Sequence, residues 1–193
     1  MKQIAVIAGP TGSGESTITN EIARRFPDHV VRLVTATTRT PRDNEISGVD
    51  YYFFTKDEFA AHVKDGSILE STYIANRDVY YGTYIPDLQK KIDSGKAIII
   101  NPDIVGARYY KEHYGATTIF IVPTNIDELE HRIRSRSPGV SEAEIAKRRD
   151  NAAKEIREEQ SFYDFTVVNA DGKLQEAVGE VVEILKKEGY ELG

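Results

Sequence analysis

Gly9-Pro10-Thr11-Gly12-Ser13-Gly14-Glu15-Ser16 is the stretch of sequence that decides the fold. It follows a near-continuous apolar run at residues 3–8, which is typical of a strand covered on both faces. Residues 16–26 then carry apolar side chains at helical spacing. The stretch matches the pattern G-x-x-x-x-G-K-[ST] except at the lysine, which is replaced by Glu15. A strand, a glycine-rich loop and a helix in this order predict the opening unit of a nucleotide-binding α/β fold.

The rest of the chain continues this alternation, apart from one β-rich segment. Apolar and β-branched runs predict further strands at residues 30–34, 51–54, 68–73, 79–83, 97–100, 117–122 and 165–168. Helical spacing predicts helices at residues 56–64, 85–93, 126–136, 142–160 and 174–187. Strands that alternate with helices favour an α/β fold with a parallel sheet and right-handed crossovers. The strands between residues 30 and 83 predict a small β-rich insert in it.

The amino-acid composition excludes several classes of protein function. The chain has 193 residues, of which 40% are hydrophobic and 29% charged, as expected for one globular α/β domain. It has no cysteine, which excludes a disulfide framework and a thiolate metal site. Its apolar runs are too short to span a bilayer, and no signal-peptide pattern begins it, so we expect a cytoplasmic protein. The net charge of −6 argues against non-specific binding of nucleic acid, while clustered arginines still permit a phosphorylated small molecule. The oligomeric state is left open.

The glycine-rich loop predicts a binding site for nucleotide phosphates. Its glycines let backbone N–H groups point at phosphate oxygens, and the following helix directs its positive end to the same place. The hydroxyl group of Ser16 is positioned to bind Mg²⁺. The candidate ATP-binding residues are Gly9, Pro10, Thr11, Gly12, Ser13, Gly14, Glu15, Ser16 and Thr17.

Glu15 is the departure from the motif. A lysine here would contact the β- and γ-phosphates, whereas two like charges 4 Å apart repel by about 4 kcal/mol at an effective dielectric constant near 20. The strand at residues 97–100 ends in Asn101, where P-loop kinases usually have a carboxylate directed at Mg²⁺. We hypothesise that Glu15 helps to hold the metal and partly replaces the missing acid, with Asn101 beside it. An inactivated kinase and an engineered change at position 15 are the alternatives that the sequence leaves open.

A second group of motifs lies in the insert. Residues 35–42 read Thr-Ala-Thr-Thr-Arg-Thr-Pro-Arg, and residues 48–53 read Gly-Val-Asp-Tyr-Tyr-Phe. Glu70 follows on a later predicted strand, and residues 80–83 read Tyr-Tyr-Gly-Thr. In order and spacing these motifs resemble those of the guanylate kinase family, and the resemblance extends over about residues 3–187. It implies a P-loop NTPase three-layer fold with a core at residues 1–34, 84–124 and 161–193, a GMP-binding insert at 35–83 and a helical lid at 125–160.

The side chains of the insert suit a guanine nucleotide. Arg39 and Arg42 can grip a phosphate group through planar guanidinium groups, and the hydroxyl groups of Tyr51 and Tyr81 can donate to the same phosphate. Guanine presents N1–H and N2–H₂ side by side, and the single carboxylate of Glu70 can accept from both, whereas adenine has no such pair. By resemblance, three further residues would contact the edges of the base, namely Thr35, Thr83 and Asp103.

The predicted lid carries arginines. Arg132 and Arg136 lie four residues apart and share a face of one predicted helix, and Arg148 lies on the next. By resemblance, these arginines close over the donor phosphates and act in catalysis together with Ser16. Asn169, after the strand at residues 165–168, resembles the asparagine with which the family contacts the donor adenine.

The resemblance implies a guanylate kinase reaction, in which Mg²⁺-dependent transfer of the γ-phosphoryl group of ATP to GMP gives ADP and GDP. Its substrates would be ATP and GMP, without a nucleic acid or membrane partner, and Glu15 would weaken the rate. A catalytically inactive guanylate-kinase-like module that binds nucleotide or protein is the alternative. Kinase activity on a sugar phosphate is a third possibility, against which Glu70 argues because it is placed to read guanine.

Overall fold

A computed structural model describes residues 2–42, 45–75, 78–136 and 139–193. Its larger sheet has the strand order β2-β7-β1-β8-β9, and each neighbouring pair is parallel. In that order the strands are β2 (Val30–Arg32), β7 (Ala97–Ile100), β1 (Ile4–Ala8), β8 (Thr117–Val122) and β9 (Phe165–Val168). The predicted parallel sheet is therefore confirmed.

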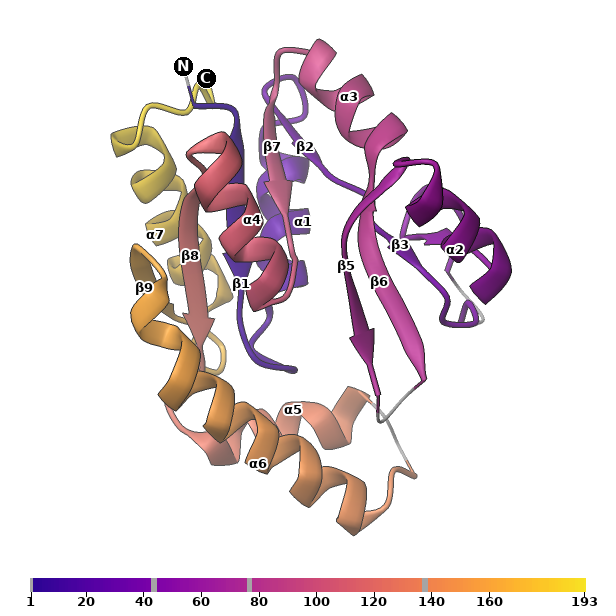
Figure 1. Cartoon of the computed structure of the whole chain (residues 1–193). Helices are drawn as coiled ribbons and strands as arrows, with labels where there is room; N and C mark the ends of the chain where they lie inside the picture. The colour runs from indigo at the N-terminus through magenta and orange to yellow at the C-terminus, as the bar shows by residue number, and fades with distance from the viewer. Residues whose placement is uncertain (1, 43–44, 76–77, 137–138) are drawn as a thin grey trace.

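Helices cover both faces of this sheet (Figure 1). One face packs on α1 (Glu15–Arg25) and α7 (Leu174–Lys187), and the other packs on α3 (Ile85–Asp93) and α4 (Ile104–Tyr114). The alternation along β1 explains the two cores: Ala5 and Ile7 belong to the first, and Ile4, Val6 and Ala8 to the second. The result is the three-layer α/β fold that the sequence predicts.

Helix α4 is the one helix of the described core that the sequence patterns do not predict. Its segment contains Gly106, three tyrosines and one histidine, which are weak helix formers. The ends of the helix compensate, since the side chain of Asp103 caps its first turn and Gly115 ends it at a left-handed φ of 61°. The first turn of this helix lies beside Glu70 of the insert.

The insert is a second, four-stranded sheet with the strand order β4-β3-β6-β5. Its strands are β4 (Tyr52–Phe53), β3 (Ala36–Thr37), β6 (Val79–Tyr84) and β5 (Ile68–Ile74), and α2 (Lys56–Lys64) packs beside them. The two-residue strand β3 is too short for a sequence pattern to show. Ala36, Phe59 and Ile68 form a small core of their own. The insert is therefore stabilised by a small hydrophobic core of its own.

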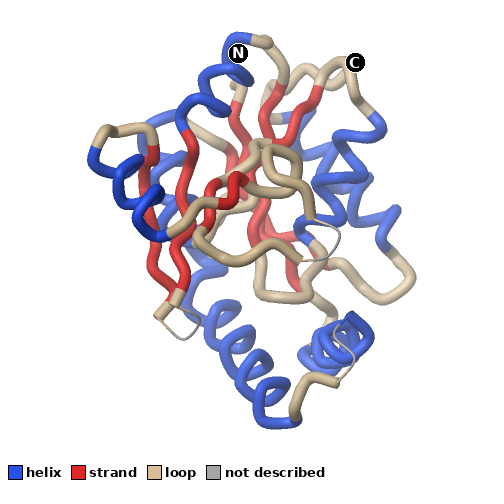
Figure 2. Tube along the Cα trace, turned by 90° about the vertical axis from the view of Figure 1, so that its right-hand side faces the viewer, coloured by secondary structure: helices blue, strands red, loops and turns tan. Residues whose placement is uncertain are grey.

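Two helices form the predicted lid segment, α5 (Ile126–Arg136) and α6 (Glu142–Glu159), followed by a 3₁₀ turn at Gln160–Phe162. They pack on each other through Leu129, Ile133, Ile145 and Ala152. Figure 2 shows the pair extending beyond the strand ends, while Ile156 near the end of α6 packs against the core beside the larger sheet. Across the described ranges, no helix has the length and hydropathy needed to cross a membrane.

The carboxyl ends of the parallel strands meet at one edge of the larger sheet. The glycine-rich loop follows β1 there, Asn101 follows β7 and Asn169 follows β9. The insert and α6 border the same edge (Figure 1). In an open α/β sheet this edge is where ligands bind, so the predicted site residues converge on it.

Candidate active site

The glycine-rich loop needs its glycines for space and for conformation. Gly12 and Gly14 have φ values of 94° and 95°, in the left-handed region. A Cβ atom on Gly14 would lie 2.4 Å from Nδ2 of Asn169, and one on Gly9 would lie 2.4 Å from the carbonyl oxygen of Ile121. The loop backbone therefore curls close to its neighbours at the N-terminus of α1, as a phosphate cradle requires.

Two predicted donor-side residues hold this loop from outside. Nδ2 of Asn169, a buried side chain, donates to the carbonyl oxygen of Ser13 at 2.7 Å. The guanidinium group of Arg132 donates to the carbonyl oxygens of Asn169 at 2.7 Å and of Ser13 at 3.4 Å. Its Nε donates to Oδ1 of Asp171 at 2.7 Å. Arg132 thus joins helix α5 of the lid to the phosphate loop.

A cavity of about 350 Å³ lies on this donor side. Its lining residues are Gly12, Gly14, Thr17, Arg132, Asn169, Ala170, Asp171, Gly172 and Leu174. Five of these belong to the predicted ATP-binding and lid residues, so the structure brings those five together.

Glu15 lies in the first turn of α1, where the positive end of the helix favours a carboxylate. The hydroxyl group of Ser13 donates to its Oε2 at 2.9 Å, and that of Ser16 lies 3.4 Å from its Oε1. The negative charge of Glu15 also contributes to raising the pKa of Tyr51 in the insert, although burial is the largest cause. The carboxylate is therefore held beside the hydroxyl group that is predicted to bind Mg²⁺.

Asn101 presents an oxygen atom to the same edge. Its Nδ2 donates to the carbonyl oxygen of Ile7 at 2.8 Å and to Oγ1 of Thr19 at 2.9 Å. A carbonyl oxygen can only accept, so the orientation of the amide is settled. The buried Oδ1 has no hydrogen-bond partner among the residues that the structure describes, and Asn101 borders the cavity of the acceptor side.

These oxygen atoms fit a magnesium ion. A carboxylate, a hydroxyl group and an amide oxygen are hard ligands of the kind that Mg²⁺ accepts, and it usually keeps substrate phosphates and water as further ligands. Within the described ranges, no group of three or more acidic, histidine or cysteine side chains could hold a metal by itself. The side chains of Glu15, Ser16 and Asn101 are therefore of the kind that the predicted Mg²⁺ requires.

A second cavity, of about 310 Å³, is lined by residues of the insert, of the sheet edge and of α6. The predicted residues that border it are Thr11, Thr35, Tyr51, Glu70, Tyr81, Asn101, Asp103 and Arg148. The sequence patterns missed the others, which are Thr72, Ile74, Gly82, Pro102, Asn151 and Glu155. Asn151 and Glu155 lie three and seven residues after Arg148, so the helical face of Arg148 was the signal that could have identified them.

Glu70 has the most unusual environment in this cavity. Its φ of 43° is left-handed, and the register of β5 against β6 shifts between Leu69 and Thr72. The hydroxyl group of the buried Thr83 donates to its Oε1. Burial raises the pKa of Glu70 to about 8, and the nearby charge of Asp103 acts in the same direction. The strand bulge thus places a partly buried carboxyl group at the cavity.

Replacing Glu70 with glutamine should change how stability depends on pH. A folded-state pKa near 8, above the unfolded value of 4.5, gives stability that is present below pH 4.5 and lost as pH rises through 8. Because glutamine does not ionise, the Glu70→Gln variant should not lose this stability, and above pH 8 its free energy of unfolding should exceed that of the unchanged protein by about 2 to 4 kcal/mol. Thermal unfolding from pH 5 to 9 measures the difference, with Glu58→Gln at the exposed start of α2 as the control. A difference that stays constant with pH contradicts the prediction.

Of the two arginines predicted to bind the acceptor phosphate, only Arg39 is held in place by neighbouring side chains. Nη2 of Arg39 lies 2.8 Å from Oε1 of Glu45, and its guanidinium carbon lies 5.3 Å from the ring centroid of Tyr51. The side chain of Arg42 is 70% exposed and approaches Glu45 only at 4.0 Å. A bound phosphate group would have to compete with Glu45 for Arg39, whereas Arg42 points to solvent.

The lid arginines lie on different sides of the site. Nε of Arg148 donates to Glu144 at 2.8 Å, and Arg148 borders the acceptor cavity, while Arg132 borders the donor cavity. The backbone of Arg136 ends α5, but its side chain lies outside the described residues. The two described arginines therefore border different cavities.

Comparisons with known proteins agree with this geometry. The family model "Guanylate kinase" matches residues 1–188. A guanylate kinase of Thermosynechococcus vestitus is 41% identical over 170 residues, which cover 88% of this chain and 86% of that protein. One of Geobacter metallireducens is 39% identical over 184 residues, which cover 95% and 87%. The crystal structure of guanylate kinase from Anaplasma phagocytophilum superposes with a TM-score of 0.75 at 27% identity and covers 98% of this chain and 87% of that one. The chain therefore belongs to the guanylate kinase family.

Proposed function

We propose that this protein transfers the γ-phosphoryl group of ATP to GMP and so forms ADP and GDP. The observation that carries the proposal is the acceptor cavity, where the partly buried carboxyl group of Glu70 lies in one pocket with Arg148 and Tyr81. A carboxylate reads the paired N–H groups of guanine, and a guanidinium and a phenol group suit its phosphate. The relatives named as guanylate kinases support the same reaction.

In this reaction the side chains and the loop backbone mainly position the two substrates and neutralise the charge of their phosphate groups. The loop backbone binds the donor phosphates, and Arg132 keeps that loop in place. Arg39 and Tyr51 hold the acceptor phosphate, whose own oxygen attacks, so no protein base is needed. Arg148 and Arg136 stabilise the charge that develops on the transferred group, and closure of the lid excludes water.

Mg²⁺ would be held by Ser16, Glu15 and Asn101 together with the donor phosphates. When bound, it neutralises phosphate charge during transfer. Glu15 takes part in this proposal because it lies beside the hydroxyl group of Ser16 and because Asn101 supplies a neutral oxygen where a carboxylate is usual.

Glu15→Gln should weaken the binding of Mg²⁺ in the presence of ADP about tenfold, because an uncharged amide replaces a carboxylate ligand. Calorimetric titration of Mg²⁺ into the protein with saturating ADP gives the affinity. Glu21→Gln, on the same helix but paired with Arg24 on its surface, is the matched control. An unchanged affinity in Glu15→Gln would show that this carboxylate does not hold the metal.

A binding module without catalysis is the second candidate, and the negative charge of Glu15 in the phosphate loop is the observation that favours it. Against it stand the intact loop geometry and the arginines on both sides of the cavities. The alternative predicts that GMP binds without turnover.

A coupled assay of ADP formation tests the proposal, with ATP as donor and GMP, AMP, UMP or CMP as acceptor. We expect turnover that depends on GMP alone. If GMP binds in calorimetry and no ADP forms at any Mg²⁺ concentration, the binding module is the correct interpretation. The proposal includes a cytoplasmic location and a division of the chain into a core (1–34, 84–124, 161–193), a GMP-binding insert (35–83) and a lid (125–160).

A further inference from the structure

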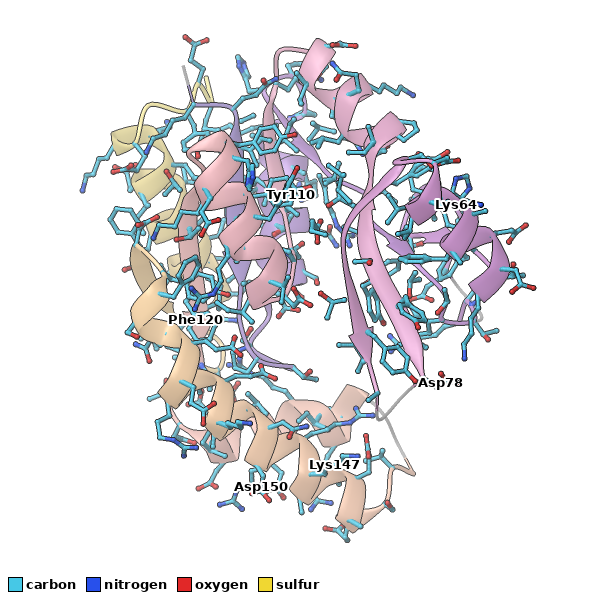
Figure 3. All side chains as sticks on the ribbon, viewed as in Figure 1. Lys64, Asp78, Tyr110, Phe120, Lys147 and Asp150 are labelled. Atoms are coloured by element: carbon cyan, nitrogen blue, oxygen red, sulfur yellow. The ribbon has the colours of Figure 1, made fainter. Side chains whose placement is uncertain are left out.

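Tyr110 has no role in the site described so far, although its hydroxyl group reaches it. The residue lies in α4 with 0% of its surface exposed and packs in the core between α4 and the larger sheet. Figure 3 shows it on α4, toward the insert. Its hydroxyl oxygen lies 2.5 Å from Oγ1 of Thr83. A buried hydroxyl group is costly unless it is hydrogen-bonded, so this contact needs an explanation beyond packing.

The direction of this hydrogen bond follows from its neighbour. When Glu70 is ionised, as it must be to accept from both N–H groups of guanine, Thr83 donates its single hydroxyl proton to Oε1 of Glu70. A hydroxyl group has one proton and two lone pairs, so Thr83 can only accept from Tyr110. Burial raises the pKa of Tyr110, which keeps the phenol protonated as a donor. Tyr110, Thr83 and Glu70 therefore form a one-way chain from α4 through β6 to β5.

Helix α4 also approaches the other oxygen of the same carboxyl group. A Cβ atom on Gly106 would lie 3.1 Å from Oε2 of Glu70. One oxygen of Glu70 is thus held by the hydrogen-bond chain, while the helix backbone limits the movement of the other. The left-handed backbone at Glu70 gives the side chain a direction, and α4 fixes its end.

We propose that Tyr110 is a positioning residue for guanine recognition, which through the Thr83 hydroxyl group holds the Glu70 carboxylate as the acceptor for the paired N–H groups of the base. The inference rests on the proposed function, because it concerns the GMP side of the same cavity. The proposal gives Tyr110, a tyrosine of the hydrophobic core, a role in base specificity. No sequence motif includes this position.

Other ionisable groups also face Glu70 and could influence its titration. They are Asp103 and Tyr109 on α4, Tyr81 on β6, Tyr51 beside β4, and Arg148 and Glu155 on α6. Tyr110→Phe leaves all of them in place and removes one oxygen atom. A change in Glu70 can then be assigned to the hydrogen-bond chain.

The first measurement needs no nucleotide. In protein labelled with ¹³C at glutamate carboxyl groups, the midpoint of Glu70 should move to higher pH by about 0.5 to 1 unit in Tyr110→Phe, because Thr83 loses the donor that favours its own donation to the carboxylate. In the kinase assay at pH 7, KM for GMP should rise about three- to tenfold with kcat unchanged.

Two further variants separate this role from a structural one. Tyr190→Phe removes an equally buried phenol oxygen, which bonds Ile4 and Thr117 far from the cavity. It should lower the melting temperature and leave the Glu70 midpoint and KM unchanged. In a Thr83→Val background, Tyr110→Phe should have no further effect on KM, because the chain is already broken.

Each outcome decides the matter. An unchanged Glu70 midpoint and unchanged KM in Tyr110→Phe overturn the inference while GMP turnover still supports the proposed function. If the Glu70 midpoint shifts in Tyr110→Phe but the protein neither binds nor phosphorylates GMP, the hydrogen-bond chain is supported. The role in guanine recognition and the proposed function are then both rejected. Additive effects of Tyr110→Phe and Thr83→Val also overturn the inference.

Discussion

Glu70→Gln is expected to lower kcat/KM for GMP about 1000-fold, the largest loss from a single side chain in this protein. The amide replaces one of the two acceptor oxygens with an NH₂ donor that faces the N–H groups of guanine, so one hydrogen bond is lost and two donors are left facing each other unpaired. Together these effects cost about 4 kcal/mol. The KM for ATP should change little, because Glu70 borders only the acceptor cavity.

Steady-state kinetics with GMP and with IMP, which lacks the 2-amino group, make the test specific. The preference for GMP over IMP should shrink in Glu70→Gln, because only an ionised carboxylate accepts from both donors of guanine. Glu58→Gln is the matched control: it lies in the same insert, is exposed, and glutamine can still form its capping box with Thr55. An unchanged preference for GMP in Glu70→Gln would mean that another group reads the base.

Restoring both motif residues at once is expected to raise kcat for GMP phosphorylation about 100-fold, through Glu15→Lys combined with Asn101→Asp. The lysine would neutralise the donor phosphates, and the aspartate would return a charged ligand to the metal. Glu15→Lys alone should give less than a tenfold gain, because it also removes the carboxylate beside Ser16.

A double-mutant cycle tests whether the two positions changed together. It compares the unchanged protein, Glu15→Lys, Asn101→Asp and the double variant. We expect the combined gain to exceed the product of the single effects. Asn101→Asp alone places a carboxylate against the carbonyl oxygen of Ile7, so it should also lower stability by about 1 to 3 kcal/mol. Rates are therefore compared well below each melting temperature. A full gain from Glu15→Lys alone would show that Asn101 does not compensate for it.

The sequence patterns predicted most of the elements because their signals are local. The bounds predicted for α2, α3, α5 and α7 are those of the structure, as are those of β7, β8 and β9. Each of these segments carries its own periodicity, cap or apolar run. Helix α4 and the short strand β3 were missed, because the first has weak helix formers and the second is held only by pairing with its neighbours.

The sequence by itself predicted the glycine-rich loop, the parallel sheet, the family and the types of side chain that we propose read a guanine nucleotide. Only the tertiary structure decided how those side chains are used. It turned Asn169 and Arg132 toward the loop carbonyl groups, left Arg42 in solvent, and buried Glu70 enough to raise its pKa. It also brought Tyr110 to Thr83 across 27 residues. The physical reason is that loop geometry and residue type are local properties, whereas desolvation and hydrogen-bond partners depend on which elements pack together.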